Sequence, residues 1–395
     1  MTRLFAAFGL YWHIILDLIL THVYAIAFLN AGYASIAAFL IAVDALLKAT
    51  LMIFLSRLIA PLSSAMRGRL SVLLRFILIA IWYSAVVQLP INSISFSIFL
   101  PFILFKIFLS ADSSLSTEFI FSLREYFHIN ISQSAAAMNI LMRSGTAIAP
   151  AVALMLLTTH YAIWGVILSV FVLGALSTIL LRKIFFAQGN HHHFSHKKYT
   201  PFSVLIQNPL MYWGFSFQFL ANLAFSGVGF LLLAQLRLHG NIFLNEITIL
   251  YTAFFITQFI VLIWGDAIIF GNQLKHMVWM VIICAVLVLI AGVSSGFMRL
   301  GVCGLIGFVY SLMLSGGQKI ITAPLKGEGF VEYSSWAQLI GRSTSFASTA
   351  ALGVLMNCGL SSSILLLLCG GVGILSAILL ASLVPKITTA YEERF

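Results

Sequence analysis

Charged residues are scarce in this chain. Asp, Glu, Lys and Arg make up 8% of its 395 residues, and 61% of the residues are hydrophobic. Ordinary soluble domains contain roughly 25% charged residues, so the composition excludes a soluble globular protein. Strict alternation of polar and apolar residues is also absent, which argues against a transmembrane β-barrel. The sequence therefore predicts an all-α integral membrane protein.

Motifs for nucleotide and metal chemistry are lacking as well. The chain contains neither HExxH nor the phosphate loop GxxxxGK[ST]. Its four cysteines lie within apolar runs and have neither paired nor metal-ligand spacing. We therefore expect no cofactor, no metal and no enzymatic activity. An intramembrane enzyme around His13 and Asp17 is the alternative of another class, and it lacks an evident third partner.

Apolar runs of about 20 residues, enough to cross a ~30 Å hydrocarbon layer as helices, recur along the whole chain. Polar or turn-rich breaks divide them into twelve predicted spans. These spans lie near residues 8–29, 32–55, 72–89, 93–111, 132–157, 161–181, 209–235, 245–264, 276–297, 299–320, 336–356 and 360–383.

The longest hydrophilic connection separates six spans from six. It predicts an N-terminal bundle over 1–186, a basic, His-rich linker over 187–205 and a C-terminal bundle over 206–395. The histidines of the linker are either a metal or pH-sensing cluster or part of a solvated loop, and no Cys or carboxylate stands near them to favour a metal.

Basic residues set the expected orientation. With a cytoplasmic N-terminus, fourteen of the twenty-one Lys and Arg residues fall in cytoplasmic segments, and only Arg237 and Arg299 fall outside. This is the asymmetry of the positive-inside rule. Both termini are therefore expected in the cytoplasm, and the net charge of +10 needs no nucleic-acid partner.

The two halves repeat each other. Tyr11–Trp12 recurs as Tyr212–Trp213, 201 positions later, and Arg143 recurs as Arg342, 199 positions later. Two matches at nearly one offset, each in the same ordinal span, indicate an internal duplication. The predicted fold is thus two six-helix pseudo-repeats.

Twelve spans in two repeats, joined by a basic cytoplasmic loop, resemble the major facilitator superfamily over the whole chain. The runs "ILFKIFLSADSSLSTEFIFSL" and "NISQSAAAMNILMRSGTAIAPAVA" resemble spans four and five of its drug and siderophore efflux branch, which includes the enterobactin exporter. By this resemblance Gly145 and Pro150 occupy an antiporter motif, and the first, fourth, seventh and tenth helices line a cavity.

The resemblance also implies gating loops, and one of them departs from the family pattern. The loop before span three retains Arg67 and Arg69 but not the usual carboxylate, whereas the corresponding loop of the second half retains Asp266. The missing acid puts the usual cytoplasmic gate, and standard antiporter behaviour, in question.

Asp17 lies near the middle of the first span, where an isolated carboxylate is costly unless it meets water, a proton or a basic partner. His13 is four residues earlier on the same helix face, and histidine titrates near neutral pH. We predict that these two residues exchange the coupling proton. The alternative is a structural hydrogen bond from Asp17 to a neighbouring helix.

Other polar groups in the spans are candidates for cargo binding. Lys106 and Arg143 lack an acid on their own helix face, so they either meet Asp17 or bind a substrate carboxylate. Tyr24 continues the face of Asp17. Gln218 and Asn222 occupy the matching face of span seven and bind either substrate or each other. Asp44 and Lys48 have the spacing of an ion pair within one helix, which is either structural or part of a gate.

The sequence thus predicts a secondary transporter of the bacterial inner membrane, coupled to protons and acting as a monomer in contact with lipid. The expected cargo is a small, carboxylate-bearing molecule of siderophore or drug type, moved outward. Import of a siderophore or an organic anion is the alternative, because alternating access is reversible. A structural or receptor role is the third, which the charges within the spans oppose.

Overall fold

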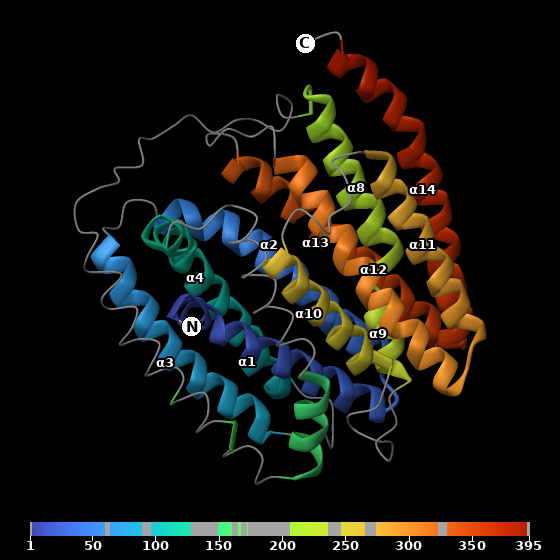
Figure 1. Ribbon diagram of the computed structural model, residues 1–395. Helices are drawn as coiled ribbons and strands as arrows, with labels where there is room; N and C mark the ends of the chain where they lie inside the picture. Colours follow the sequence, from blue (N-terminus) through green and yellow to red (C-terminus); the bar gives the residue numbers. More distant parts are fainter. Residues whose placement is uncertain are drawn as a thin grey trace. The chain divides into compact units, whose positions relative to one another are not determined.

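The structure is a computed structural model, and every element of secondary structure in its described part is an α-helix (Figure 1). The described residues are 2–59, 64–88, 96–127, 149–159, 165–166, 172, 206–235, 246–264, 274–322 and 330–392. They fall into two compact units. The first comprises Met1–Tyr33 and Leu47–His193, and the second comprises Ala34–Leu46 and Phe194–Phe395.

The first unit is built mainly from four long helices. They are α1 (Thr2–Asn30), the second half of α2 (Ala34–Ile59), α3 (Ser64–Val87) and α4 (Phe96–Phe127). α1 packs against α3 and α4, which also pack against each other. Trp82 lies in their core and donates its Nε1–H to the carbonyl of Leu16 across 3.1 Å.

Two helix boundaries in this unit were wrong in the sequence-based prediction. The expected loop before span three is largely helical, since α3 begins at Ser64 and contains Arg67 and Arg69. α4 continues to Phe127, although the apolar run of span four ends near residue 111. Both extensions are polar but free of proline and consist mostly of residues that a helix tolerates. Hydropathy marks the apolar part of such helices and not their ends.

The second unit contains the remaining long helices. They are α8 (Pro209–Phe225), α9 (Val228–Ala234), α10 (Glu246–Trp264), α11 (Leu274–Val293), α12 (Gly296–Thr322), α13 (Phe330–Asn357) and α14 (Ser362–Glu392). α8 begins with a capped first turn: the side chain of Asn208 accepts from the N–H of Leu210 across 3.0 Å, and Pro209 occupies the first turn. α8 and α9 together form the predicted seventh span, interrupted at Ser226 and Gly227.

Glycines and polar side chains bring the helices of this unit into close contact. A Cβ at Gly307 of α12 would lie 2.0 Å from the carbonyl oxygen of Leu250 on α10, so only glycine permits this approach. Further along the same pair of helices, Nε2 of Gln258 donates to the hydroxyls of Ser311 and Ser315, each at 2.7 Å. Interhelical hydrogen bonds of this kind hold helices together where water is absent.

Several described helices have the length and composition of membrane spans. Five meet both criteria: Arg69–Val87, Pro209–Ala234, Leu274–Val293, Gly296–Gly317 and Ser362–Val384. Of the predicted fifth and sixth spans, only short pieces lie in the described part of the chain. The count of twelve spans therefore stays a prediction.

Candidate functional site

An ion pair between α1 and α4 lies in the core of the first unit. Lys106 of α4 forms a salt bridge and hydrogen bond with Oδ1 of Asp17 on α1. It also donates to the hydroxyl of Thr21 across 2.6 Å, and its Nζ lies 4.8 Å from the centre of the Phe102 ring. Asp17 and Lys106 are both 0% exposed. The helical period brings these groups together, because each helix contributes two residues four positions apart.

A second carboxylate, Asp112, lies in the same core. Its Oδ1 accepts a hydrogen bond from Ser71, and its Oδ2 lies 3.2 Å from Nε of Arg75, both on α3. Nδ1 of His13 on α1 is 3.4 Å from the same Oδ2. All four side chains are at most 4% exposed. The predicted partner of Asp17, His13, is therefore placed beside Asp112.

The Asp17–Lys106 pair and the Asp112–Arg75 pair lie close enough along α1 and α4 to form one site. His13 and Asp17 are one turn apart on α1, and Lys106 and Asp112 are separated by about 9 Å of rise on α4. A buried carboxylate stays ionised only with paired charges and hydrogen bonds. The arrangement supplies one basic side chain for each carboxylate and adds a histidine, a residue type that can exchange protons near neutral pH.

Tyr24 is enclosed rather than presented to a cavity. Its hydroxyl lies 2.9 Å from the carbonyl oxygen of Ile98 on α4 and 3.3 Å from that of Ala85 on α3, and its side chain is 0% exposed. The ring packs on Phe102 with centroids 5.0 Å apart. These contacts tie α1 to the other two helices.

Gln218 and Asn222 on α8 interact with each other and with α13. The amide nitrogen of Asn222 donates to the backbone carbonyl of Gln218 at 2.7 Å and to its Oε1 at 3.2 Å. A Cβ at Gly341 of α13 would stand 3.0 Å from that nitrogen. Of the two interpretations that the sequence allowed, the described contacts show the mutual hydrogen bond.

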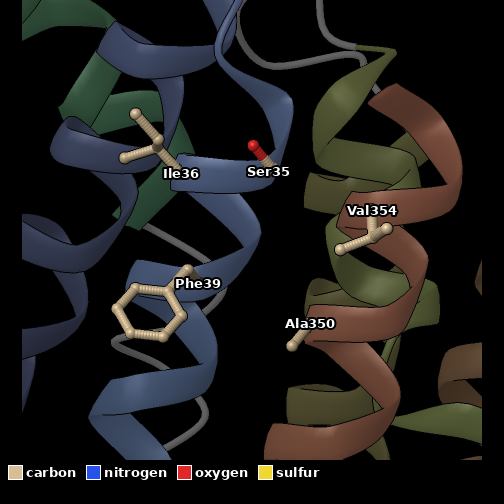
Figure 2. Close-up of a pocket in the computed structure, with 5 residues that line it drawn as sticks. All are labelled: Ser35, Ile36, Phe39, Ala350 and Val354. Atoms are coloured by element: carbon tan, nitrogen blue, oxygen red, sulfur yellow. The ribbon is translucent and has the colours of Figure 1, made fainter. Parts of the chain in front are cut away.

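A cavity of about 300 Å³ opens between the start of α2 and the end of α13, within the second unit (Figure 2). Its lining is apolar apart from one hydroxyl and consists of Ser35, Ile36, Phe39, Ala350 and Val354. Beside it, Nδ2 of Asn357 donates to Oγ of Ser35 across 2.7 Å. A Cβ at Gly353 would lie 2.2 Å from Cβ of Ala38, so the two helices are in direct contact.

The remaining candidates are scattered. Arg69 is exposed in the first turns of α3, and Pro150 is buried in a helical segment. Arg143, Gly145 and Asp266 lie outside the described residues, as do the side chains of Asp44, Lys48 and Arg67. Among the described residues no group of three His, Cys, Asp or Glu side chains has the geometry of a metal site.

Sequence reasoning missed Asp112, Arg75 and Ser71. In the sequence, Asp112 lies six residues after Lys106 and off its helix face, and Arg75 is one of the fourteen basic residues counted as cytoplasmic. One signal was present: both are charges adjoining or within apolar runs, and Arg75 stands four residues after Ser71 on one face of a helix. Asp112 lies 37 positions after Arg75 and 41 positions after Ser71 in the sequence. The periodicity of a single helix cannot reveal contacts between residues so far apart.

One stretch of the sequence matches a catalytic motif but does not have the local fold that the motif requires. Gly292 to Gly296 has the spacing GxSxG, the nucleophile elbow of a strand–turn–helix unit. Here the run spans the end of α11 and the turn to α12, and its central Ser294 is 9% exposed. The structural context that gives this motif its chemistry is absent at this position.

No protein-family model matches the chain, and no curated protein matches it in sequence. Solved transporter structures are nevertheless similar to it in fold. A variant of the E. coli fucose:proton symporter FucP is 16% identical, with a TM-score of 0.59 over 96% of this chain and 98% of that one. The nucleoside transporter NupG is 14% identical, with a TM-score of 0.61 over 96% and 98% of the two chains. A mutant of NupG is 15% identical, with a TM-score of 0.64 over 97% and 100%.

Identities of this size bear on the fold alone. The fold similarity agrees with the all-helical architecture and the apolar spans described above. The chain therefore shares the fold of these transporter structures.

Proposed function

We propose that this protein is a secondary transporter that uses a proton gradient to move a small organic molecule across the bacterial inner membrane by alternating access. The observation that carries the proposal is the fully buried pair of Asp17 and Lys106 between α1 and α4. Ionisable residues inside a membrane protein are costly, and they mark ion pathways, substrate pathways and proton relays. A purely structural ion pair adds little stability to a fold compared with an apolar contact of equal volume.

The pair provides a switch that a proton operates. When Asp17 binds a proton, it no longer balances the charge of Lys106, and the attraction between α1 and α4 weakens. Because interactions between charges are stronger in a low-dielectric interior than in water, this loss is large enough to shift the balance between two conformations. The fold neighbour FucP is named a fucose:proton symporter, which supports a role for protons in this fold.

The direction and cargo rest on other grounds. The resemblance to the drug and siderophore efflux branch implies outward transport of a drug-like or siderophore-like molecule. The basic residues Lys106 and Arg143, which lack an acid on their own helix face in the sequence, favour one that carries a carboxylate. We assign the protein to the inner membrane as a monomer with both termini in the cytoplasm. Import of an organic anion is the second candidate.

Purified protein in liposomes loaded with a pH-sensitive dye tests the proposal. A panel of benzoate, 2,3-dihydroxybenzoate, fucose, uridine and ethidium is added outside, and internal pH and internal compound are measured together. We expect at least one compound to change both in the wild type. In Asp17→Asn, proton-driven accumulation falls at least about tenfold, while exchange of labelled for unlabelled compound persists, because exchange needs no net proton movement.

The matched control is Lys275→Gln, which removes an exposed charge from the first turn of α11. It is expected to behave as the wild type. Accumulation by Asp17→Asn that follows the proton gradient as well as the wild type would show that this carboxylate is not the coupling group.

A further inference from the structure

Arg299 lies at the end of the first turn of α12, shortly after the connection from α11. Its side chain is 9% exposed, and its Nε and Nη2 are both buried without a hydrogen-bond partner. A covered guanidinium without an acceptor is strongly unfavourable. Loss of a proton does not remove this cost, because arginine remains charged in proteins. An anion from outside the chain would remove it.

We infer that Arg299 binds the phosphate group of an anionic membrane phospholipid at this end of α11 and α12. The ligand class is a phosphodiester with a net negative charge, such as that of phosphatidylglycerol. The inference goes beyond the proposed transport function and is independent of it, because a lipid binds at this turn whether or not cargo crosses the membrane.

The two unpartnered nitrogens form one edge of the guanidinium. Nε and Nη2 lie on the same side of this planar group, and one N–H bond of each runs parallel to the other. Such a fork matches two oxygens on one central atom, which is how arginine binds phosphate and carboxylate. A chloride ion or a single hydroxyl does not match this pair of donors. The free edge therefore points to an oxyanion.

Further donors lie at the same turn. The hydroxyl of Ser294, two residues before α12 begins, is buried and has no hydrogen-bond partner. The first N–H groups of α12 have no acceptor within their own helix, and the positive end of the helix dipole favours an anion. Arg299, Ser294 and this helix end thus all offer hydrogens for the same kind of ligand.

The side chains beside Arg299 assign the oxyanion to a lipid. Phe297 is 90% exposed, and Val293 and Met298 are also largely exposed. Since α11 and α12 have the length and composition of membrane spans, apolar side chains at their junction are covered by lipid rather than by water. A phospholipid held at Arg299 places its acyl chains against these residues. A free phosphate ion gains nothing from them.

The expected orientation gives the leaflet. Arg299 is one of the two basic residues expected on the outer side of the membrane, where positive charge is otherwise sparse. The site therefore takes a lipid of the outer leaflet. Its headgroup reaches the free edge when the long arginine side chain turns towards the bilayer surface, as arginine side chains near helix ends do.

Glu246 at the start of α10 is the acid against which the inference has to be tested. A Cβ at Gly304 of α12 would lie 3.4 Å from Cγ2 of Ile249, and Gly307 adjoins Leu250, so α10 and α12 begin at the same end. Glu246 nevertheless makes no hydrogen bond with Nε or Nη2 of Arg299. We expect Glu246→Gln to leave lipid binding unchanged.

Thermal unfolding with and without lipid tests the inference, because a ligand that binds the folded state raises the unfolding midpoint. The full chain and Arg299→Met are purified in the uncharged detergent dodecyl maltoside and titrated with phosphatidylglycerol, phosphatidylcholine or glycerol 1-phosphate. We expect phosphatidylglycerol to bind the wild type at least about tenfold more tightly than phosphatidylcholine, whose own cation competes with Arg299. Arg299→Met should lose this preference.

The variant is informative because it should fold well. Without lipid, Arg299→Met is expected to be at least as stable as the wild type, since it removes an unpartnered charge from the interior. The matched control Lys275→Gln, which removes an exposed charge from the first turn of α11, should respond to both lipids as the wild type does. Phe297→Ser should weaken phosphatidylglycerol binding through lost contact with the acyl chains.

Three results would overturn the inference. An equal preference for phosphatidylglycerol in the wild type and Arg299→Met would show that the lipid charge acts elsewhere. Glycerol 1-phosphate that stabilises the wild type as strongly as phosphatidylglycerol at the same concentration would show a site for a soluble anion. A lower unfolding midpoint of both Arg299→Met and Glu246→Gln without lipid would show that these two residues pair within the chain.

Discussion

Arg75 on α3 and Asp112 on α4 form a buried ion pair, with Nε 3.2 Å from Oδ2 and exposed fractions of 4% and 0%. Removing one member takes a charged partner from the other in the core. We expect Asp112→Asn to lower the free energy of unfolding by about 3–5 kcal/mol, measured by thermal or denaturant unfolding of the purified protein.

The double variant Arg75→Met with Asp112→Asn is the informative companion. Because it removes both charges, most of the lost stability should return. If the double variant is less stable than Asp112→Asn alone, the two side chains do not act as a pair. Transport should stay impaired in the double variant if Asp112 takes part in proton exchange.

Tyr24→Phe separates structure from cargo binding. It deletes only the hydroxyl that bonds the carbonyl of Ile98, so we expect a loss of about 1 kcal/mol in stability and an unchanged KM for transport. The control is Tyr212→Phe on α8, whose side chain is 47% exposed and which should change neither quantity. A KM raised tenfold in Tyr24→Phe, with stability unaffected, would restore the cargo-binding role that the sequence predicted.

Two glycines of α12 provide a matched test of the contact with α10. Gly307→Ala places a Cβ 2.0 Å from the carbonyl oxygen of Leu250, whereas a Cβ at Gly301 has no neighbour within 4 Å. We expect Gly307→Ala to destabilise the protein by about 1–3 kcal/mol. Gly301→Ala should be neutral or stabilising by up to about 1 kcal/mol, since alanine favours the helix. Equal unfolding midpoints for the two variants would argue against the close packing.

The contact beside the α2–α13 cavity is accessible to chemical cross-linking. Cysteines replacing Ser35 and Asn357 should react with a short bis-thiosulfonate reagent in a Cys358→Ser background, because their parent side chains are hydrogen-bonded at 2.7 Å. Adding Gly353→Ala, whose Cβ would lie 2.2 Å from that of Ala38, should slow the reaction at least about tenfold by forcing the helices apart, since cross-linking depends steeply on separation. Cross-linking that is indifferent to Gly353→Ala would contradict this contact.

Sequence patterns predicted most of the fold in the second unit. Span eight was placed at 245–264, and α10 runs over Glu246–Trp264, because a polar segment and a strongly apolar run meet at a sharp boundary there. α3 and α4 were placed less well because their ends carry charges. Arg75 looks like a loop residue to a hydropathy scale, yet Asp112 allows it to be buried within the helix.

The site was only partly predictable for the same reason. The sequence named Asp17 and Lys106 and raised their pairing as one of two possibilities, since both are lone charges in apolar runs. It assigned His13 to Asp17, because spacing within one helix is all that a single sequence shows. The position of His13 beside Asp112 depends on how α1 and α4 are rotated against each other, and this rotation is determined by many packing contacts at once.

The division of α2 has a consequence for the order of folding. Its first residues, Ala34–Leu46, belong to the unit that otherwise begins at Phe194, and the hydrogen bond between Ser35 and Asn357 closes a separation of 322 positions. During synthesis, these turns of α2 leave the ribosome long before α13 exists. Contacts at such separation form slowly, so this end of the helix acquires its native neighbours among the last steps of assembly. These first turns of α2 therefore cannot complete their contacts until the C-terminal part of the chain has been made.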